Sequence, residues 1–415
     1  MLSELWSKWR GKWWFWIFIL VFLSFSVLIS ILNGNKVLSE FTDFIVFYLT
    51  GSKFGLGEPL YGKLNERFEF LLYPPFSAFL FYFSTFLSAV DAATLFSLFN
   101  ILLYVLIVYQ LIQLLDLFNY TYKEIKIPLL LAIVFSLRYY FANFNLLQIN
   151  EVTLVLILGG VIAFKKGNPV TCSILFSIAA CIKIIPAVFL IWLFFRVPRI
   201  KIILASILTA LILFAIPFPF RGFEQSINDL RDFYIQILHP YLVSPEVYNQ
   251  YYNQSLPAAI GRLLMPSNNE STFTYNVLNL PYHQVARIVS VANVVLALSF
   301  LAALFYRVRK KISFGLEEIA LVFLFSHLYS SLTWKNHLVS MIVVFVPLFM
   351  IPFRSQTKMM KAVLLFLYTL LVILSLNISF LIPDEVRFLI GGFSLYTLMM
   401  MILYVAFVVR SFRYH

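Results

Sequence analysis

A few charged side chains stand at the ends of long apolar segments of this chain. Asp43 follows the first such segment, and Arg138, Lys183, Arg262 and His337 occupy short polar breaks farther along. Polar groups inside or just above a membrane are costly, so each is a functional candidate. One carboxylate can act as a base, while cations can hold a leaving phosphate that needs no general acid. The set therefore suits transfer from a phosphate-activated sugar, with Asp43 and His337 as catalytic candidates and the other three as phosphate partners.

Amide and aromatic side chains accompany these candidates along the chain. We expect them to shape a pocket for the sugar and the acceptor: Tyr48, Tyr73, Asn143, Gln148, Asn150, Asn253, Gln254 and Trp334. The sequence lacks the paired carboxylates of glycoside hydrolysis. It also lacks HExxH, cysteine clusters, a Walker loop and GxGxxG. We therefore expect no metal and no cofactor.

The composition identifies the medium in which these residues lie. Of 415 residues, 61% are hydrophobic and 12% are charged, whereas soluble proteins have about 25% charged residues. The apolar runs are roughly 17–25 residues long, the length at which a helix crosses a bilayer. Barrel strands would instead alternate apolar and polar residues. The sequence predicts an all-α polytopic membrane protein embedded in the lipid bilayer, with no soluble domain.

The basic residues report on topology. Thirteen apolar segments are separated by two long polar stretches, 33–74 and 218–283, and by short loops. The loops assigned to the cytoplasm hold 19 Lys and Arg against 5 Asp and Glu, and the outer stretches hold 9 against 14. Such a bias orients membrane proteins, and it gives the net charge of +12 a role other than binding nucleic acid. We predict both termini in the cytoplasm and the candidate residues on the outer side.

Two features modify the count of membrane spans. The segment 75–90 is short and begins at a Pro-Pro pair, so we expect an interfacial or re-entrant helix in the first outer loop, 33–92. This leaves about twelve transmembrane helices. The segments 170–182 and 184–196 are each short for a bilayer and flank Lys183. Irregular backbone at that depth is tolerated where it lines a polar cavity, which indicates a site there.

We expect one integral-membrane domain over 1–415, with a catalytic module (1–217), a large outer loop (218–283) and C-terminal helices (284–409).

Seven motifs, in this order, resemble those of a known family. They are Asp43-Phe44, the turn Gly57-Glu58-Pro59-Leu60-Tyr61, Tyr73-Pro74-Pro75-Phe76, the amide-rich stretch 143–150, Lys183-Ile184-Ile185-Pro186, Asn253-Gln254-Ser255-Leu256 with Arg262 downstream, and Trp334-Lys335-Asn336-His337. The chain resembles the integral-membrane GT-C glycosyltransferases. It is most similar to glycosyltransferase family 87, the polyprenyl-phosphate-mannose-dependent α-mannosyltransferases.

The resemblance implies a GT-C-type fold and an inverting, metal-independent reaction at the outer face of the plasma (inner) membrane. It implies that Asp43 is the general base and that Lys183 contacts the phosphate. The expected substrates are a polyprenyl-phosphate sugar, with mannose as the hexose, and a glycolipid or glycan acceptor. One position departs from the family pattern, because Leu147 stands where the family usually has a glycine before Gln148.

Simpler interpretations stand beside these. Asp43 is a favoured residue type for capping a helix, Lys183 could reach the membrane interface with its long side chain, and His337 could be a satisfied polar residue at the end of a span. Another class of protein is a transporter or flippase of lipid-linked sugars, which often has inverted repeats and broken helices. We see no internal repeat, and the polar candidates gather at one side of the predicted topology.

Overall fold

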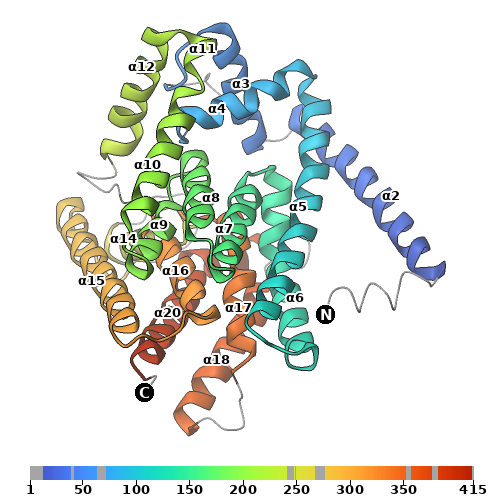
Figure 1. Cartoon of the computed structure of the whole chain (residues 1–415). Helices are drawn as coiled ribbons and strands as arrows, with labels where there is room; N and C mark the ends of the chain where they lie inside the picture. The colour runs from blue at the N-terminus through green and yellow to red at the C-terminus, as the bar shows by residue number, and fades with distance from the viewer. Residues whose placement is uncertain are drawn as a thin grey trace. The chain divides into compact units, whose positions relative to one another are not determined.

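A computed structural model describes residues 13–38, 42–62, 72–240, 247, 249–266, 276–351, 357–375 and 382–413. Every regular element within these ranges is helical, and none of them contains a strand (Figure 1). The prediction of an all-helical protein is therefore confirmed. The chain forms two compact units, one of residues 1–122 and 143–239 and the other of residues 123–142 and 240–415.

The first unit contains α2 (Trp13–Asn35), η1 (Lys36–Leu38), α3 (Asp43–Leu56), α4 (Pro75–Tyr82), η2 (Phe83–Phe86), α5 (Ala89–Leu117), α7 (Asn150–Lys165), α8 (Pro169–Ile182), α9 (Ala187–Arg196), α10 (Ile200–Ala215), α11 (Phe218–Arg221), α12 (Phe223–Asp232) and η3 (Phe233–Leu238). The second contains α14 (Leu256–Leu264), α15 (Tyr282–Arg309), α16 (Leu316–Tyr329), η4 (Lys335–Ser340), α17 (Met341–Phe349), α18 (Lys358–Ser375), α19 (Asp384–Gly392) and α20 (Leu395–Arg413). Helix α6 (Tyr122–Leu146) contributes to both.

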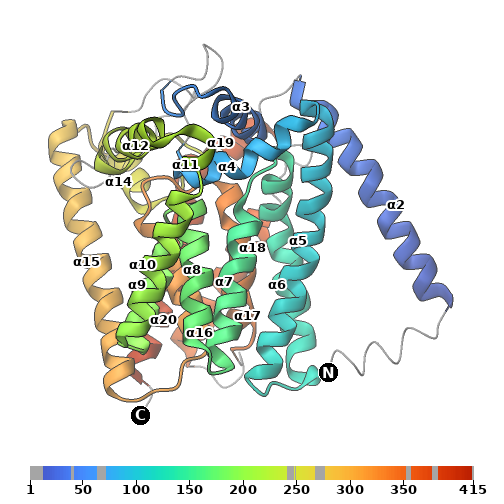
Figure 2. The same ribbon diagram turned by 45° about the horizontal axis from the view of Figure 1, so that its top comes forward.

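Small residues allow close helix packing in the first unit. Helix α7 packs against α5 and α8, and α8 packs against α10. A Cβ atom at Gly160 would lie 2.4 Å from the ring of Phe176, so this glycine lets α7 and α8 approach. Helices α3 and α4 lie together at one end of this helix group (Figure 2). A Cβ atom at Gly51 of α3 would lie 2.5 Å from the carbonyl oxygen of Phe81, which fixes how closely α3 approaches α4.

Helix α16 is the centre of the second unit. Its residues are almost all buried, and it packs against α15, α17 and α20. Phe325 stacks on Phe300 of α15 with ring centroids 4.1 Å apart. At one end of α16, the carboxylate of Glu318 accepts a 2.6 Å hydrogen bond from Arg307 Nε.

The apolar helices have the lengths and surfaces of a multi-pass membrane protein. Six described helices are long and apolar enough to cross a membrane, and five shorter apolar helices accompany them. Many of their large apolar side chains are exposed, for example those of Leu20, Leu211 and Leu298, as expected for surfaces in contact with lipid. The total of twelve spans remains a prediction. The basic residues of the first twelve positions, which supported a cytoplasmic N-terminus, lie outside the described residues.

The predicted break beside Lys183 is confirmed, because helix α8 ends at Ile182 and α9 begins at Ala187. Pro75 begins a helix of eight residues, α4, which is followed by the 3-10 helix η2. That the segment 75–90 lies at the membrane interface or is re-entrant stays a prediction.

Candidate active site

Asp43 lies in the first turn of α3, one residue after the N-cap residue Thr42. The partial positive charge of a helix N-terminus favours a carboxylate in the first turn. Asp43 is only 7% exposed, and its Oδ2 accepts a hydrogen bond from Gln148 Nε2. The structure thus assigns the cap position to Thr42 and places the Asp43 carboxylate against an amide that lies 105 residues away in the sequence.

Gln148 connects the carboxylate to a buried phenol. Its Oε1 accepts hydrogen bonds from the Tyr73 hydroxyl at 3.2 Å and from the backbone N–H of Ile149 at 3.3 Å. These bonds fix the amide so that its Nε2 donates to Asp43. Burial and the charge of Asp43 raise the pKa of Tyr73 above its ordinary value, so this phenol remains protonated and able to donate.

Lys183 occupies the break between α8 and α9. Its Nζ donates to Asn150 Oδ1 at 2.8 Å and lies 5.4 Å from the centroid of the Tyr73 ring. Burial lowers the pKa of Lys183 to about 7, and the negative charge of Asp43 acts in the opposite direction. The ammonium and the carboxylate are therefore close enough to influence each other, around the same tyrosine.

A second amide supports this arrangement. Asn150 Nδ2 donates to Asn143 Oδ1 at 2.9 Å, and Asn143 Nδ2 donates both to Gln148 O at 3.3 Å and to the Glu151 carboxylate. Glu151 is fully buried, and its Oε1 has no hydrogen-bond partner in the described part of the chain. Sequence analysis assigned this carboxylate no role. Its only local signal is its position directly after Asn150, at the end of an apolar helix.

The backbone before Gln148 adopts an unusual conformation. Leu147 has φ of +53°, in the left-handed region that favours glycine. Its side chain is fully buried and packs in a cluster with Phe44 and Ile45 of α3. This is the position at which the resembled family usually has a glycine. Leu147 thus adopts this conformation while its side chain packs against α3.

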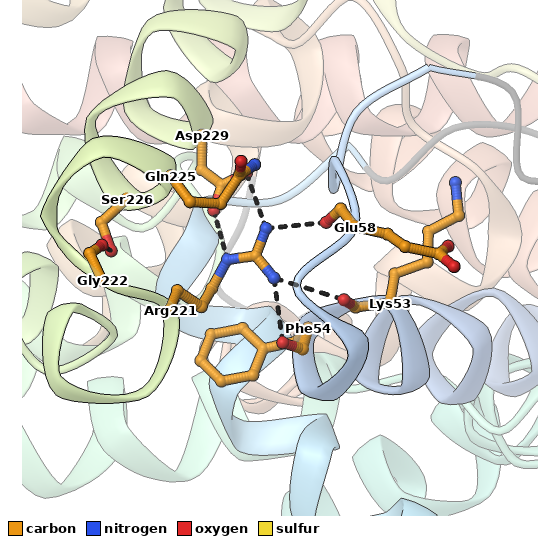
Figure 3. Close-up of polar contacts among 8 residues, drawn as sticks. All are labelled: Lys53, Phe54, Glu58, Arg221, Gly222, Gln225, Ser226 and Asp229. Carbon is orange, nitrogen blue, oxygen red and sulfur yellow. Dashed lines mark hydrogen bonds and ion pairs between the residues drawn. The ribbon is translucent and has the colours of Figure 1, made fainter.

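The other end of α3 is held by a buried ion pair, which sequence analysis did not identify (Figure 3). Arg221 donates to both carboxylate oxygens of Asp229, at 2.6 and 3.1 Å. It also donates to the carbonyl oxygens of Lys53, Phe54 and Glu58 at 3.3, 2.9 and 2.7 Å. Carbonyl groups at a helix C-terminus lack partners within the helix, so Arg221 caps the helix whose first turn carries Asp43. Burial raises the pKa of Asp229, while its hydrogen bonds with Arg221 and Gln225 act in the opposite direction.

Tyr48 lies apart from the polar network of Asp43. Its hydroxyl donates to the carbonyl oxygen of Leu87 at 2.9 Å. The network therefore contains six of the predicted residues, all in the first unit: Asp43, Tyr73, Asn143, Gln148, Asn150 and Lys183.

In the second unit, the predicted loop residues bind other parts of that unit. Asn253 donates to Ser331 O at 2.8 Å and accepts from the backbone N–H of Thr333 at 2.9 Å. Gln254 donates to the carbonyl oxygens of Tyr251 and Gly391 at 2.7 and 3.1 Å. These amides connect the loop before α14 to α19 and to the segment after α16.

Arg262 supports the same loop from α14. Its Nη1 donates to the carbonyl oxygens of Gln250 and Asn253, both at 2.6 Å, and its Nη2 donates to Ser394 Oγ at 2.7 Å. The side chain is buried. Its guanidinium is thus engaged with protein acceptors, in the same manner as that of Arg221.

Trp334 and His337 form a stacked pair at the start of η4. Their rings are almost parallel, with centroids 6.0 Å apart, and His337 Nδ1 accepts from the backbone N–H of Trp334 at 3.2 Å. The indole Nε1 is buried and has no hydrogen-bond partner in the described part of the chain. Arg138 lies in α6, and its positive charge acts on Lys335 of the same unit.

The described residues contain no group of three or more His, Cys, Asp or Glu side chains that could hold a metal ion. Among known protein families, the model described as glycosyltransferase family 87 matches residues 70–331, which is more than half of the chain. No curated protein matches it.

Proposed function

Because this chain belongs to glycosyltransferase family 87, we propose that it is an inverting hexosyltransferase. Its donor is a polyprenyl-phosphate sugar, with mannose as the hexose, and its acceptor is a glycolipid or glycan. One observation carries the proposal: a buried carboxylate, Asp43, is oriented by Gln148 and lies within the electrostatic influence of the Lys183 ammonium. A base and a cation in one polar network are the two groups that this reaction requires.

The reaction proceeds as a single displacement. The Asp43 carboxylate takes the proton of an acceptor hydroxyl, whose oxygen attacks the anomeric carbon from the face opposite the phosphate. The bond between that carbon and the phosphate oxygen breaks, the oxygen keeps the electron pair, and the configuration inverts. Lys183 stabilises the negative charge of the departing polyprenyl phosphate. Tyr73, Gln148 and Asn150 hold these two groups in place.

Three residues of the second unit keep the roles that the sequence predicts for them, as proposals: His337 in catalysis, Trp334 in sugar binding and Arg138 in phosphate binding. Arg262 was also predicted to hold phosphate, but such a contact would compete with its bonds to Gln250, Asn253 and Ser394. We propose instead that Arg262, with Asn253 and Gln254, shapes the loop before α14.

The cellular placement follows from charge. The distribution of Lys and Arg supports cytoplasmic termini, about twelve spans and an active site on the outer face of the plasma (inner) membrane. A lipid-linked donor suits that side of the membrane, where nucleotide sugars are not available.

The test is a transfer assay with purified protein, polyprenyl-phosphate mannose and a glycolipid acceptor. We expect transfer with inversion at the anomeric carbon, and we expect Asp43→Asn to lower kcat by about 10²–10⁴-fold. Asp91→Asn is the matched control, because Asp91 is exposed and its carboxylate accepts a hydrogen bond from Ser88, the N-cap residue of α5. An Asp43→Asn protein with wild-type activity would contradict the proposal. Sugar flux across liposomes without transfer would favour a transporter.

A further inference from the structure

Glu151 is a buried carboxyl group that takes no part in the proposed sugar transfer. It lies in the first turn of α7, directly after Asn150, and it is fully buried. Its Oε2 accepts a hydrogen bond from Asn143 Nδ2, whereas its Oε1 has no partner in the described part of the chain. Burying a carboxyl group is costly, so its place beside the amides of the candidate site indicates a role there.

The hydrogen bonds that begin at Glu151 lead to the Lys183 ammonium. Asn143 donates to Glu151 through Nδ2, and its Oδ1 accepts from Asn150 Nδ2 at 2.9 Å. Asn150 Oδ1 in turn accepts from Lys183 Nζ at 2.8 Å. Two amides therefore connect the carboxyl group to the ammonium, and each amide donates at one end and accepts at the other.

The direction of these bonds depends on Glu151. An amide side chain has a donor end and an acceptor end, and a rotation of the group exchanges them. Glu151 Oε2 accepts whether or not Oε1 carries a proton, so Asn143 directs its Nδ2 to Glu151 and its Oδ1 to Asn150. Asn150 must then donate to Asn143 and keep its oxygen for Lys183. With Asn150 reversed, its N–H groups would face the ammonium, and neither partner could accept.

Other groups act on the two ends of this connection. The carbonyl oxygen of Gln148 also accepts from Asn143 Nδ2, but at 3.3 Å, beyond the usual range for such a bond. The charge of Asp43 acts on Lys183 directly, and the Tyr73 ring lies against its Nζ. Glu151, by contrast, is joined to Lys183 through the two amides, so its effect depends on their orientation.

We propose that Glu151 is a positioning residue that orients Asn143 and Asn150, so that Asn150 presents its oxygen to Lys183 and holds the ammonium in place for the departing phosphate. The inference rests on the proposed function for the role of Lys183. The orientation of the two amides can be tested without sugar transfer.

The titration of Lys183 measures this orientation directly. The full-length protein in detergent carries lysine labelled with carbon-13 at Cε, and the resonance that is missing from Lys183→Arg is followed by NMR as the pH is raised. In Glu151→Met the ammonium loses its oriented acceptor, which disfavours the charged form, so we expect the midpoint to move about one pH unit lower. Glu151→Gln keeps an acceptor oxygen for Asn143 and should retain the wild-type midpoint.

Two further variants control this experiment. Thr153→Val is the matched control, because Thr153 Oγ1 donates to the backbone carbonyl oxygen of Asn150 at 2.8 Å in the same turn, and it should leave the midpoint unchanged. Asn143→Ala breaks the connection at its middle and should reproduce the shift, which keeps the test available if Glu151→Met does not fold. An unchanged midpoint in Asn143→Ala, or equal shifts in Glu151→Gln and Glu151→Met, would overturn the proposal.

Transfer kinetics provide a second measurement. Glu151→Met should lower kcat about tenfold, and Glu151→Gln should stay close to the wild type. In the Lys183→Met background Glu151→Met should cause little further loss, because residues that act through one another are not additive; two losses that multiply would contradict the proposal. If the midpoint responds as expected in a protein that transfers no sugar, the orienting role stands and the proposed function fails.

Discussion

Two sets of buried charges in the first unit each combine a cation with an aspartate but differ in how completely the protein satisfies them. In the Arg221–Asp229 pair, all three guanidinium nitrogens donate to protein oxygens, and both carboxylate oxygens accept from Arg221. Lys183, by contrast, has one hydrogen-bond acceptor among the described residues, Asn150. A completed set of bonds stabilises a fold, whereas an incomplete one leaves donors for a ligand. We infer that the first set holds α3 and that the second performs chemistry.

Removing the completed pair should have the largest effect on stability. Arg221→Met leaves the buried Asp229 carboxylate without its cation and removes the cap of α3, so we expect the free energy of unfolding to fall by about 3–5 kcal/mol. Chemical denaturation in detergent measures this. Arg231→Met, an exposed arginine on α12, is the control and should change stability by less than about 0.5 kcal/mol. Equal effects of the two variants would show that the buried pair does not stabilise the fold.

Lys183→Met should affect the transfer rate strongly and stability little, which is the reverse of Arg221→Met. Removing a cation that acts on a leaving group costs about 10²–10³-fold in kcat, while stability should be unchanged or greater because a buried ammonium is lost. Transfer kinetics and chemical denaturation of the same preparation measure the two effects. Lys165→Met provides the comparison, since Lys165 lies at the far end of α7, 4.6 Å from the Phe118 ring centroid. A transfer rate for Lys183→Met equal to that of Lys165→Met would assign Lys183 a structural role only.

The pH dependence of transfer sharpens the same distinction. With a pKa of about 7, Lys183 loses its proton as the pH rises through neutrality, so kcat/KM, which reports the free enzyme, should fall above about pH 7. In Lys183→Arg this fall should be absent or moved to much higher pH, because a guanidinium stays protonated. A pH profile identical to that of the wild type would assign the titration to another group.

Stability should vary with pH in the opposite direction. The pKa of Lys183 is lowered by folding, so the unfolded chain binds more protons between about pH 7 and the ordinary lysine value of about 10.4. The contribution of Lys183 therefore makes the folded state more stable as the pH rises through that window. The free energy of unfolding of Lys183→Met should exceed that of the wild type most below pH 7, and the difference should disappear near pH 10. A difference independent of pH would contradict the assignment of a lowered pKa to Lys183.

The sequence predicted well those features that depend on local patterns. Apolar runs identified the helices, and the short segments around Lys183 identified the break between α8 and α9. Asp43, Gln148 and Lys183 were selected because polar residues at the ends of apolar segments are costly. The structure places these three around Tyr73.

What the sequence did not reveal is which polar groups satisfy each other. Arg221 and Asp229 are near in the chain, but the carbonyl groups that complete their network lie at the end of α3 and just after it, more than 160 residues earlier. Arg262 and Lys183 were both predicted to hold phosphate, from their charge and position and, for Lys183, from the family resemblance. Only the three-dimensional arrangement distinguishes the guanidinium with protein acceptors from the ammonium with donors left over. The sequence also did not reveal the positive φ of Leu147, which belongs to the turn before Gln148.

The most direct test of this account compares two conservative substitutions of buried carboxylates in one unit. Asp43→Asn and Asp229→Asn each remove one negative charge without changing side-chain volume, and transfer rate and unfolding free energy are measured for both. The account predicts that Asp43→Asn lowers kcat by about 10²–10⁴-fold and retains stability, whereas Asp229→Asn lowers stability and its folded fraction retains transfer. Active Asp43→Asn protein, or the same loss of transfer per folded molecule in both variants, would contradict it.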